Sequence, residues 1–198
     1  MPRTHEIRLV RHGRSAHATP TGRITASEFR RWIDDYNQAG LSADCYPSQE
    51  LIAAVSDIAL VVCSDLPRSI ESVRRLVPEA QFLSGAELRI LTLFREAGRP
   101  LAGNWRLKLP LSFWDHISVA LWRHGLISGG ESVRAATSRA KQAAQTLASF
   151  TEQSGRVLCV AHGTFNALVG LQLRRFGWQG PDRLSDKHWE GGTFQRTT

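Results

Sequence analysis

Three short apolar runs in this sequence each end in basic or imidazole side chains. The run at 7–10 is followed by Arg11 and His12, the run at 58–63 by Ser64 and Arg68, and the run at 157–160 by His162 and Gly163. Arginine presents a planar fork of donors that fits phosphate oxygens, and histidine acts as a nucleophile or base near neutral pH. Two arginines and two histidines at one point suit the binding and transfer of a phosphoryl group, whose charge is spread over several oxygens. The sequence predicts such a site if the ends of the runs meet.

The ends of the runs meet if the runs are parallel strands of one sheet. They alternate with segments of helical period, which indicates a βαβ architecture, and ligands of open α/β sheets bind at the carboxyl ends of the strands. Predicted strands cover 6–11, 58–63, 81–83, 89–93, 156–160 and 193–197, the last at a sheet edge. Predicted helices cover 27–38 with Ser27 as N-cap, 48–55 with Ser48 as N-cap, 67–76, 112–124, 131–151 and 164–177.

The length of 198 residues fits one domain with a single substantial core. Segment 97–130 interrupts the alternation because it holds several prolines, glycines and tryptophans. We predict one domain over 1–198, with 97–130 as an insertion that caps the site. Trp105 and Trp114 of this insertion either line a substrate pocket or fill the insertion's own small core, and the sequence leaves both options open.

The composition is that of a globular protein, with 42% hydrophobic residues, 22% charged residues and a formal net charge of +7. Arginine supplies 22 of the 25 basic residues. These arginines are scattered rather than gathered on a face with stacking aromatics, so we expect no nucleic-acid partner. The charge then reflects a genome rich in G and C, or a field that draws anionic substrates to the site.

Membrane and metal-binding classes are disfavoured on similar grounds. No apolar stretch approaches the ~18 residues that cross a bilayer, and the run 7–10 is too short for a secretory signal. We therefore expect no membrane partner and a cytoplasmic location. Cys45, Cys63 and Cys159 are odd in number and lack metal-ligand spacing, so we expect buried, reduced thiols.

Five motifs, taken together and in order, resemble those of the histidine phosphatase superfamily, also called phosphoglycerate mutase-like. They are Leu-Val-Arg-His-Gly-Arg-Ser at 9–15, Cys-Ser-Asp-Leu-Pro-Arg-Ser-Ile-Glu-Ser at 63–72, Phe-Arg-Glu at 94–96, Gly-Gly-Glu-Ser at 129–132 and Val-Ala-His-Gly at 160–163. The resemblance covers 7 to about 170. It implies an α/β fold, a three-layer sandwich in which helices flank a mostly parallel central sheet, with a small helical insertion.

The resemblance also implies roles for the residues at the strand ends. His12 matches the family's nucleophile, which becomes phosphohistidine. Arg11 and Arg68 match its phosphate-binding arginines. His162 matches the second histidine, which binds the phosphoryl group and stabilises its developing charge, with Gly163 beside it.

Glu96 resembles the acid that protonates the leaving oxygen in the mutase-type branch. A surface ion pair with Arg95 or Arg99 is the rival interpretation. Ser64 matches a position at the rim of the pocket. No motif surrounds the remaining histidines, so we expect them to be non-catalytic; they are His5, His17, His116, His124 and His188.

The activity implied is that of a metal-independent phosphatase, without a cofactor, that acts on a small-molecule phosphate monoester through phosphohistidine. Arg14 stands where many relatives have glutamate, and the asparagine that follows in their motif is missing, which argues against a glycolytic mutase substrate. The chain also has little length for the insertion and tail that shield a mutase's phosphohistidine from water. Alternatives are a mutase-type phosphotransferase, a protein phosphohistidine phosphatase and a non-catalytic protein that binds phosphorylated ligands. The oligomeric state stays open, with a dimer as one option.

Overall fold

A central sheet organises the chain, whose computed structural model describes residues 4–98, 106–126 and 130–197. Five of the described strands form this sheet in the order β4-β3-β6-β1-β7. Neighbours are parallel except β7, which runs antiparallel to β1 at the edge. The strands of the sheet are β1 (Thr4–Arg11), β3 (Leu60–Cys63), β4 (Glu87–Ile90), β6 (Arg156–Ala161) and β7 (Gly191–Thr197).

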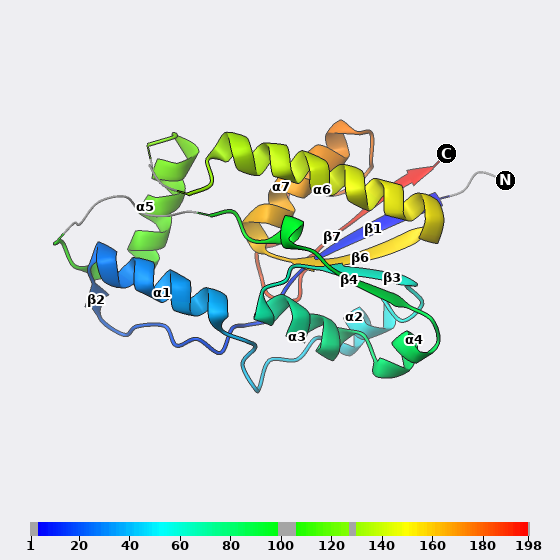
Figure 1. Cartoon of the computed structure of the whole chain (residues 1–198), viewed down its shortest axis with the longest axis horizontal. Coiled ribbons are helices and arrows are strands. Elements are labelled where there is room, and N and C mark those ends of the chain that lie inside the picture. The colour runs from blue at the N-terminus through cyan, green and yellow to red at the C-terminus, as the bar shows by residue number, and fades with distance from the viewer. Residues whose placement is uncertain (1–3, 99–105, 127–129, 198) are drawn as a thin grey trace.

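Helices cover both faces of the sheet, as the expected three-layer α/β sandwich requires (Figure 1). On one face lie α6 (Val133–Ser154) and α7 (Gly163–Arg175). On the other lie α2 (Gln49–Ala53), α3 (Pro67–Leu76) and α4 (Glu79–Leu83). Among the residues described, no helix is long and apolar enough to cross a membrane.

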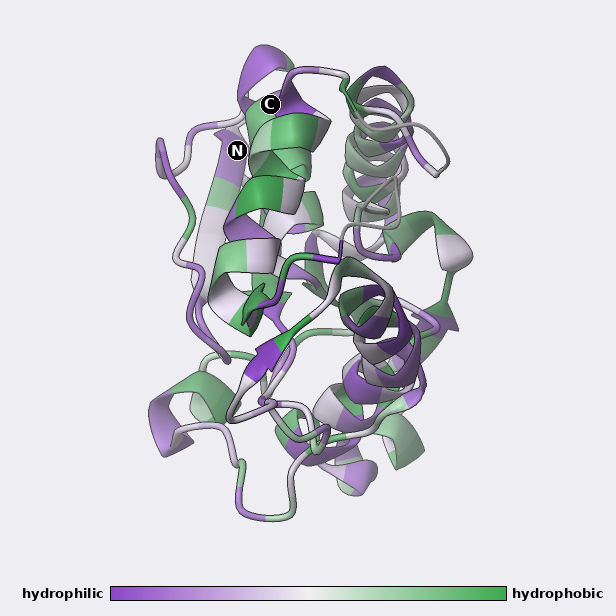
Figure 2. Ribbon diagram, turned by 90° about the vertical axis from the view of Figure 1, so that its left-hand side faces the viewer, coloured by the Kyte–Doolittle hydropathy of each residue, from purple (hydrophilic) through white to green (hydrophobic). Residues whose placement is uncertain are grey.

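The two faces of β1 belong to two different cores because successive side chains of a strand point in opposite directions. Ile7 and Leu9 are fully buried in the core beneath α6 and α7, whereas Val10 is buried in the core beneath α3. Figure 2 shows hydrophobic and hydrophilic residues alternating around the helix ribbons, as amphipathic helices against a sheet require. The three cysteines are free and buried, as predicted.

A smaller unit lies beside the carboxyl ends of the parallel strands (Figure 1). It consists of α1 (Ala26–Gln38), α5 (Leu111–Arg123) and a two-stranded sheet of β2 (Arg23–Ile24) and β5 (Leu109–Pro110). Trp114 is fully buried here against Phe29 of α1, so it fills the unit's core instead of lining a pocket. Trp105 lies outside the described residues.

The first helix begins earlier than the sequence analysis predicted. Thr25, not Ser27, is the N-cap of α1. The Thr25 Oγ1 accepts the Glu28 N–H, and the Glu28 carboxylate accepts the Thr25 N–H, which is a reciprocal capping box. The capping box satisfies two unpaired N–H donors at once, whereas a cap at Ser27 would leave Glu28 without this role.

The strand predicted over 81–83 is wrong, because those residues form the end of α4. The Gln81 side-chain amide donates to the Val55 and Ile58 carbonyls, and these contacts hold the short helix against the neighbouring loop. The strand predicted over 89–93 is shifted: β4 ends at Ile90, and Thr92–Phe94 forms a 3-10 turn, η1. Short apolar runs do not distinguish a strand from a buried turn of helix.

Candidate active site

The turn after β1 presents the first two side chains of the site. Arg11 ends the strand, and His12 and Gly13 form the turn. The Gly13 N–H donates to the Ser72 Oγ over 2.9 Å, which ties the turn to α3. A Cβ on Gly13 would lie 2.4 Å from Cζ2 of Trp189, so only glycine lets the indole pack this closely.

The imidazole of His12 is held in one tautomer. Its Nδ1 donates to the Gly13 carbonyl over 2.7 Å, which leaves the lone pair on Nε2. The Arg68 Nε donates to this Nε2 over 3.1 Å. Burial and, next, the Arg68 charge lower the pKa of His12 well below the usual value of 6.5. The ring is therefore neutral near pH 7 and carries its lone pair on Nε2.

Arg68 is itself buried, in the first turn of α3, and it links the sheet to the smaller unit. Beyond its contact with His12, its Nη1 donates to the Tyr36 carbonyl over 3.0 Å and its Nη2 to the Asn37 Oδ1 over 3.2 Å. The guanidinium also lies 4.3 Å from the centre of the Tyr36 ring. The two side chains of α1 thus orient the cation beside the imidazole.

His162 follows β6 and lies edge-on to His12, with ring centres 4.9 Å apart. It is fully buried, and its Nε2 lies 3.4 Å from the Ser69 Oγ. Its Nδ1 has no hydrogen-bond partner among the described residues. Burial, followed by the nearby His12, lowers the pKa of His162 well below 6.5. Both imidazoles are therefore neutral near pH 7.

Glu96 lies at the N-terminus of α7. Its Oε1 accepts the Phe165 N–H over 3.0 Å and the Ala97 N–H over 2.9 Å, and its Oε2 accepts the Thr164 N–H over 3.4 Å. The free N–H groups of a helix N-terminus stabilise a carboxylate in this position. Among the described residues, the backbone at the start of α7 and at Ala97 orients this side chain.

The rival ion pair proposed for Glu96 is wrong for Arg95, whose Nη2 instead lies 2.5 Å from the Asp65 carboxylate. Arg99 lies outside the described residues. The segment that carries Glu96 is held from α6 by Arg139, which donates to the Arg95 carbonyl over 2.8 Å. Arg139 in turn pairs with Glu131 over 2.6 Å.

A cavity of about 830 Å³ lies at the junction of the sheet and the smaller unit. Its wall includes Arg11, His12, Arg68 and Glu96. His162 lies behind His12 and is not part of the wall. In the described part of the chain, no group of three or more His, Cys, Asp or Glu side chains could hold a metal ion.

Two further predicted residues also lie near the cavity without lining it. Ser64 is fully buried, and its Oγ accepts the Leu66 N–H over 3.3 Å at the entry to α3. Gly163 starts α7 next to the Arg11 side chain, and a Cβ there would lie 3.5 Å from the Arg11 Cδ, an ordinary van der Waals distance.

The match with a protein-family model decides the family. Residues 7–187 match the model of the histidine phosphatase superfamily (branch 1). The chain belongs to this superfamily. The match spans every predicted site residue, from Arg11 to Gly163, which confirms the resemblance that the motifs suggested. No curated protein sequence matches the chain significantly.

Solved structures with the same fold include phosphatases and a phosphoglycerate mutase. Phosphoglycerate mutase from Bacillus anthracis has a TM-score of 0.64 at 15% identity, with 100% of this chain and 92% of that chain covered. A putative alpha-ribazole-5'-P phosphatase from Escherichia coli has 0.55 at 19% identity, covering 86% and 78%. A phosphoserine phosphatase from Entamoeba histolytica has 0.53 at 14% identity, covering 98% and 94%. At these identities the likeness shows the fold alone.

In this superfamily member, the segment before β7 is a part of the site that sequence reasoning missed. The His188 Nδ1 donates to the His12 carbonyl over 2.9 Å, and the two ring centres lie 5.6 Å apart. The Trp189 N–H donates to the Arg11 carbonyl over 3.0 Å, and the Arg11 Nη1 donates to the Asp186 carbonyl. The segment lacks a clear hydrophobic period, and no local signal links it to a turn more than 170 residues earlier.

Proposed function

We propose that this chain is a phosphatase that hydrolyses a phosphate monoester through a phosphohistidine on Nε2 of His12. The orientation of His12 carries the proposal: Nδ1 is committed to the Gly13 carbonyl, and Nε2 faces the cation Arg68. A neutral imidazole whose Nε2 lone pair points towards a fixed cation is suited to attack an electrophilic phosphorus once the phosphoryl group has taken over that cation. The superfamily assignment agrees with this chemistry.

Arg11 and Arg68 are the residues that we propose to hold the phosphoryl oxygens, since both line the cavity beside His12. The Arg68 Nε now occupies the Nε2 lone pair at 3.1 Å, so the phosphoryl group must displace this contact as it binds. The guanidinium then exchanges one acceptor, the imidazole, for another, a phosphate oxygen. His162, whose ring meets that of His12, would stabilise charge as it develops on the transferred group.

Glu96 is the group that we propose to move the proton. In the first step His12 Nε2 bonds to phosphorus, the ester P–O bond breaks, and protonated Glu96 delivers its proton to the leaving oxygen. In the second step water bonds to phosphorus, the P–N bond breaks, and the Glu96 carboxylate accepts a proton from the water. Inorganic phosphate leaves, and His12 returns to its neutral form. Such a positioned acid contributes ~10²–10⁴-fold to the rate.

We extend the proposal to the metal requirement, the substrate class and the cellular location of the enzyme. We propose hydrolysis without a metal ion, because Arg11 and Arg68 already supply positive charge to the phosphoryl oxygens. We also propose a small-molecule substrate and a cytoplasmic location, which suits the three buried free cysteines.

Hydrolysis of p-nitrophenyl phosphate, with and without a chelator, tests the proposal. We expect activity that survives the chelator and is lost in His12→Ala but kept in His124→Ala, which alters an exposed histidine at the end of α5. Rapid quenching should trap an acid-labile, base-stable phosphoprotein in the native enzyme and not in His12→Ala. Full activity in folded His12→Ala would refute the nucleophile, and binding without turnover would favour the non-catalytic alternative.

A further inference from the structure

Glu131 and Arg139 form an ion pair that the proposed chemistry leaves without a role. Glu131 belongs to the motif at 129–132 and directly precedes the N-cap of α6, whereas Arg139 lies about two helical turns into that helix. The Arg139 Nε donates to Oε1 of Glu131 over 2.7 Å, and its Nη2 donates to Oε2 over 2.6 Å. Two parallel hydrogen bonds fix the plane of the guanidinium as well as its position.

The same guanidinium bonds to the backbone that carries Glu96. Its Nη1 donates to the Leu93 and Arg95 carbonyls, each over 2.8 Å, and its Nη2 lies 3.5 Å from the Glu96 carbonyl oxygen. The Glu131 carboxylate in turn accepts the Gly98 N–H over 3.4 Å. The pair therefore contacts the main chain on both sides of Glu96.

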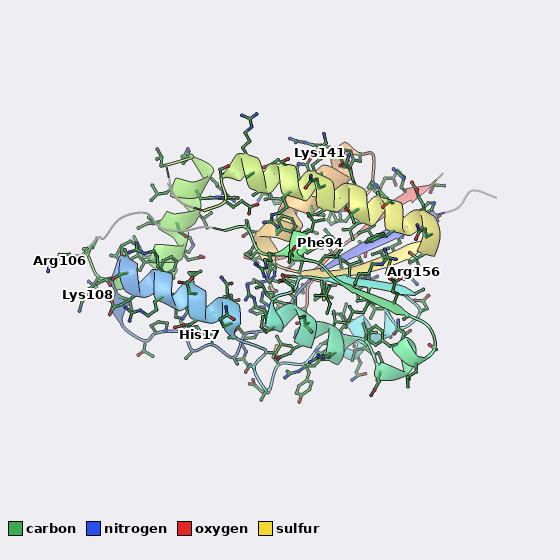
Figure 3. All side chains as sticks on the ribbon, viewed as in Figure 1. His17, Phe94, Arg106, Lys108, Lys141 and Arg156 are labelled. Atoms are coloured by element: carbon green, nitrogen blue, oxygen red, sulfur yellow. The ribbon has the colours of Figure 1, made fainter. Side chains whose placement is uncertain are left out.

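Arg139 also contacts the residue that holds the Glu96 carboxylate. Its Cζ lies 3.9 Å from the centre of the Phe165 ring, and the Phe165 N–H donates to Oε1 of Glu96 over 3.0 Å. Phe94, which Figure 3 shows between α6 and the sheet, meets the Phe165 ring edge-on with centres 6.4 Å apart. One cation thus touches both the backbone that carries Glu96 and the helix residue that orients its carboxylate.

The pair is mostly buried and lies outside the substrate cavity. The side chains of Arg139 and Glu131 are 20% and 19% exposed. Loss of either partner would leave the other as an uncompensated charge with little water around it. Neither side chain is part of the cavity wall, whereas Glu96 is. The pair is therefore placed to affect the reaction through Glu96 rather than through contact with substrate.

We propose that Glu131 and Arg139 are positioning residues that keep Glu96 within reach of the leaving oxygen of the substrate. A general acid must lie within hydrogen-bond distance of the atom it protonates, and a misplacement of ~1 Å costs on the order of 10²-fold in rate. The N–H groups of α7 hold the carboxylate of Glu96, and Arg139 holds its backbone. This inference rests on the proposed role of Glu96 in the phosphatase reaction.

Arg139→Met, assayed on two substrates, tests the inference. Ethyl phosphate needs protonation of its leaving oxygen, whereas p-nitrophenyl phosphate needs little. We expect kcat for ethyl phosphate to fall about tenfold more than kcat for p-nitrophenyl phosphate, which is a part of the ~10²–10⁴-fold that a positioned acid contributes. Lys141→Met is the matched control, because it removes a cation from an exposed position of the same helix (Figure 3), and it should leave both rates unchanged.

Two milder variants extend the test. Arg139→Lys keeps the charge but loses the planar fork, so the selective loss on ethyl phosphate should persist at about threefold. Glu131→Gln leaves Arg139 with a neutral partner and should give a selective loss smaller than that of Arg139→Met. Urea denaturation shows whether each variant is folded. If Arg139→Met does not fold, the two milder variants decide the question by the same comparison of substrates.

A double-mutant cycle with Glu96→Gln shows whether the pair acts through Glu96. Once the acid is removed, Arg139→Met should lower kcat for ethyl phosphate by less than about twofold further, because coupled residues are not additive. A purely structural role would slow both substrates to the same extent and would add its full loss to that of Glu96→Gln.

The outcomes separate this inference from the proposed function. Equal losses on both substrates in Arg139→Met, or full additivity in the cycle, overturn the inference and leave the phosphatase proposal intact. Equal losses in Glu96→Gln itself overturn the acid and the inference together, but leave His12 as the nucleophile. Failure of the native enzyme to hydrolyse any phosphate monoester overturns the proposed function.

Discussion

Arg68 donates a hydrogen bond from its Nε to Nε2 of His12 over 3.1 Å, so a buried cation directly covers the lone pair of a buried neutral imidazole. This contact exists because the His12 Nδ1 is already committed to the Gly13 carbonyl. It places a permanent positive charge where negative charge would develop on a phosphoryl group. Its geometry also depends on α1, since Tyr36 and Asn37 accept hydrogen bonds from the other two nitrogens of the guanidinium.

Loss of the Arg68 fork should reduce turnover strongly. We expect Arg68→Ala to lower kcat/KM for p-nitrophenyl phosphate, with a loss of ~2–4 kcal/mol of transition-state stabilisation, as removal of an oxyanion donor causes. Arg68→Lys should recover little, because an ammonium group cannot make the three separate contacts of the guanidinium. Arg74→Lys, at an exposed position on α3, is the control and should behave as the native enzyme does. Recovery of full activity in Arg68→Lys would contradict the assigned role.

Stability should fall as the solution becomes acidic, because His12 and His162 are buried in the neutral form. Burial lowers the pKa of each below 6.5 in the folded chain, so the unfolded chain binds more protons below that pH. The two neutral histidines therefore contribute fully to the free energy of unfolding above pH ~6.5. As the pH falls below that value, the free energy of unfolding decreases by up to about 1.4 kcal/mol per pH unit for each histidine. Urea denaturation between pH 5 and 8 measures this slope.

The acid branch of that stability profile should respond to substitution. His162→Gln removes one of the two buried imidazoles and should flatten the dependence on pH. His124→Gln alters an exposed histidine and should leave the slope unchanged. A slope that is the same in all three proteins would show that other groups cause the acid destabilisation.

Glu96→Gln should separate chemistry from helix capping. If Glu96 donates the proton to the leaving oxygen, the variant loses far more activity on an alkyl phosphate than on p-nitrophenyl phosphate, whose leaving group needs little protonation. The amide oxygen can still accept the Phe165 and Ala97 N–H groups, and only the long Thr164 contact is lost, so stability should fall by less than ~1 kcal/mol. Equal losses on both substrates would assign Glu96 a purely structural role.

His188 should act as a positioning residue, since it bonds to the backbone of His12 without lining the cavity. We expect His188→Ala to lower kcat about fivefold, in line with the loss of one hydrogen bond of ~1 kcal/mol, with little effect on KM. His188→Asn keeps a donor near the carbonyl and should restore part of kcat. An increase in KM with constant kcat would instead indicate a direct contact with substrate.

Gly13→Ala should destabilise the turn through a steric clash. The new Cβ would lie 2.4 Å from the Trp189 ring, so the indole must move, at a cost of ~1–3 kcal/mol. Gly22→Ala is a matched control, because nothing lies within 4 Å of a Cβ at that position. Trp189→Leu should relieve the clash, so that Gly13→Ala costs less in that background. Thermal unfolding of the single and double variants measures the coupling.

Much of the candidate site follows from local sequence. His12, Arg68 and His162 could be placed because each follows a short apolar run, and parallel strands bring their carboxyl ends to one edge of the sheet. The proline at the start of α3 and Gly163 beside His162 marked where strand gives way to helix. These signals are short-range, so they survive without knowledge of the packing.

The tertiary structure alone decided which other residues join them. Tyr36 and Asn37 reach Arg68 because α1 packs across the strand ends, and His188 reaches His12 because β7 returns beside β1. No nearby residue in the sequence marks either contact. A helix pattern specifies an apolar face, but the element against which that face is buried depends on the global arrangement of the chain.

This contrast between local motifs and tertiary packing explains which sequence predictions were wrong. The sequence by itself determined most of the strand and helix alternation, the chemistry at three strand ends and the family, because these depend on hydrophobic period and local motifs. The packing decided that 81–83 is helical, that Trp114 fills a core while Trp32 lines the cavity, and that His162 is hidden behind His12. Burial and orientation arise from contacts between distant segments, and only the folded chain contains those contacts.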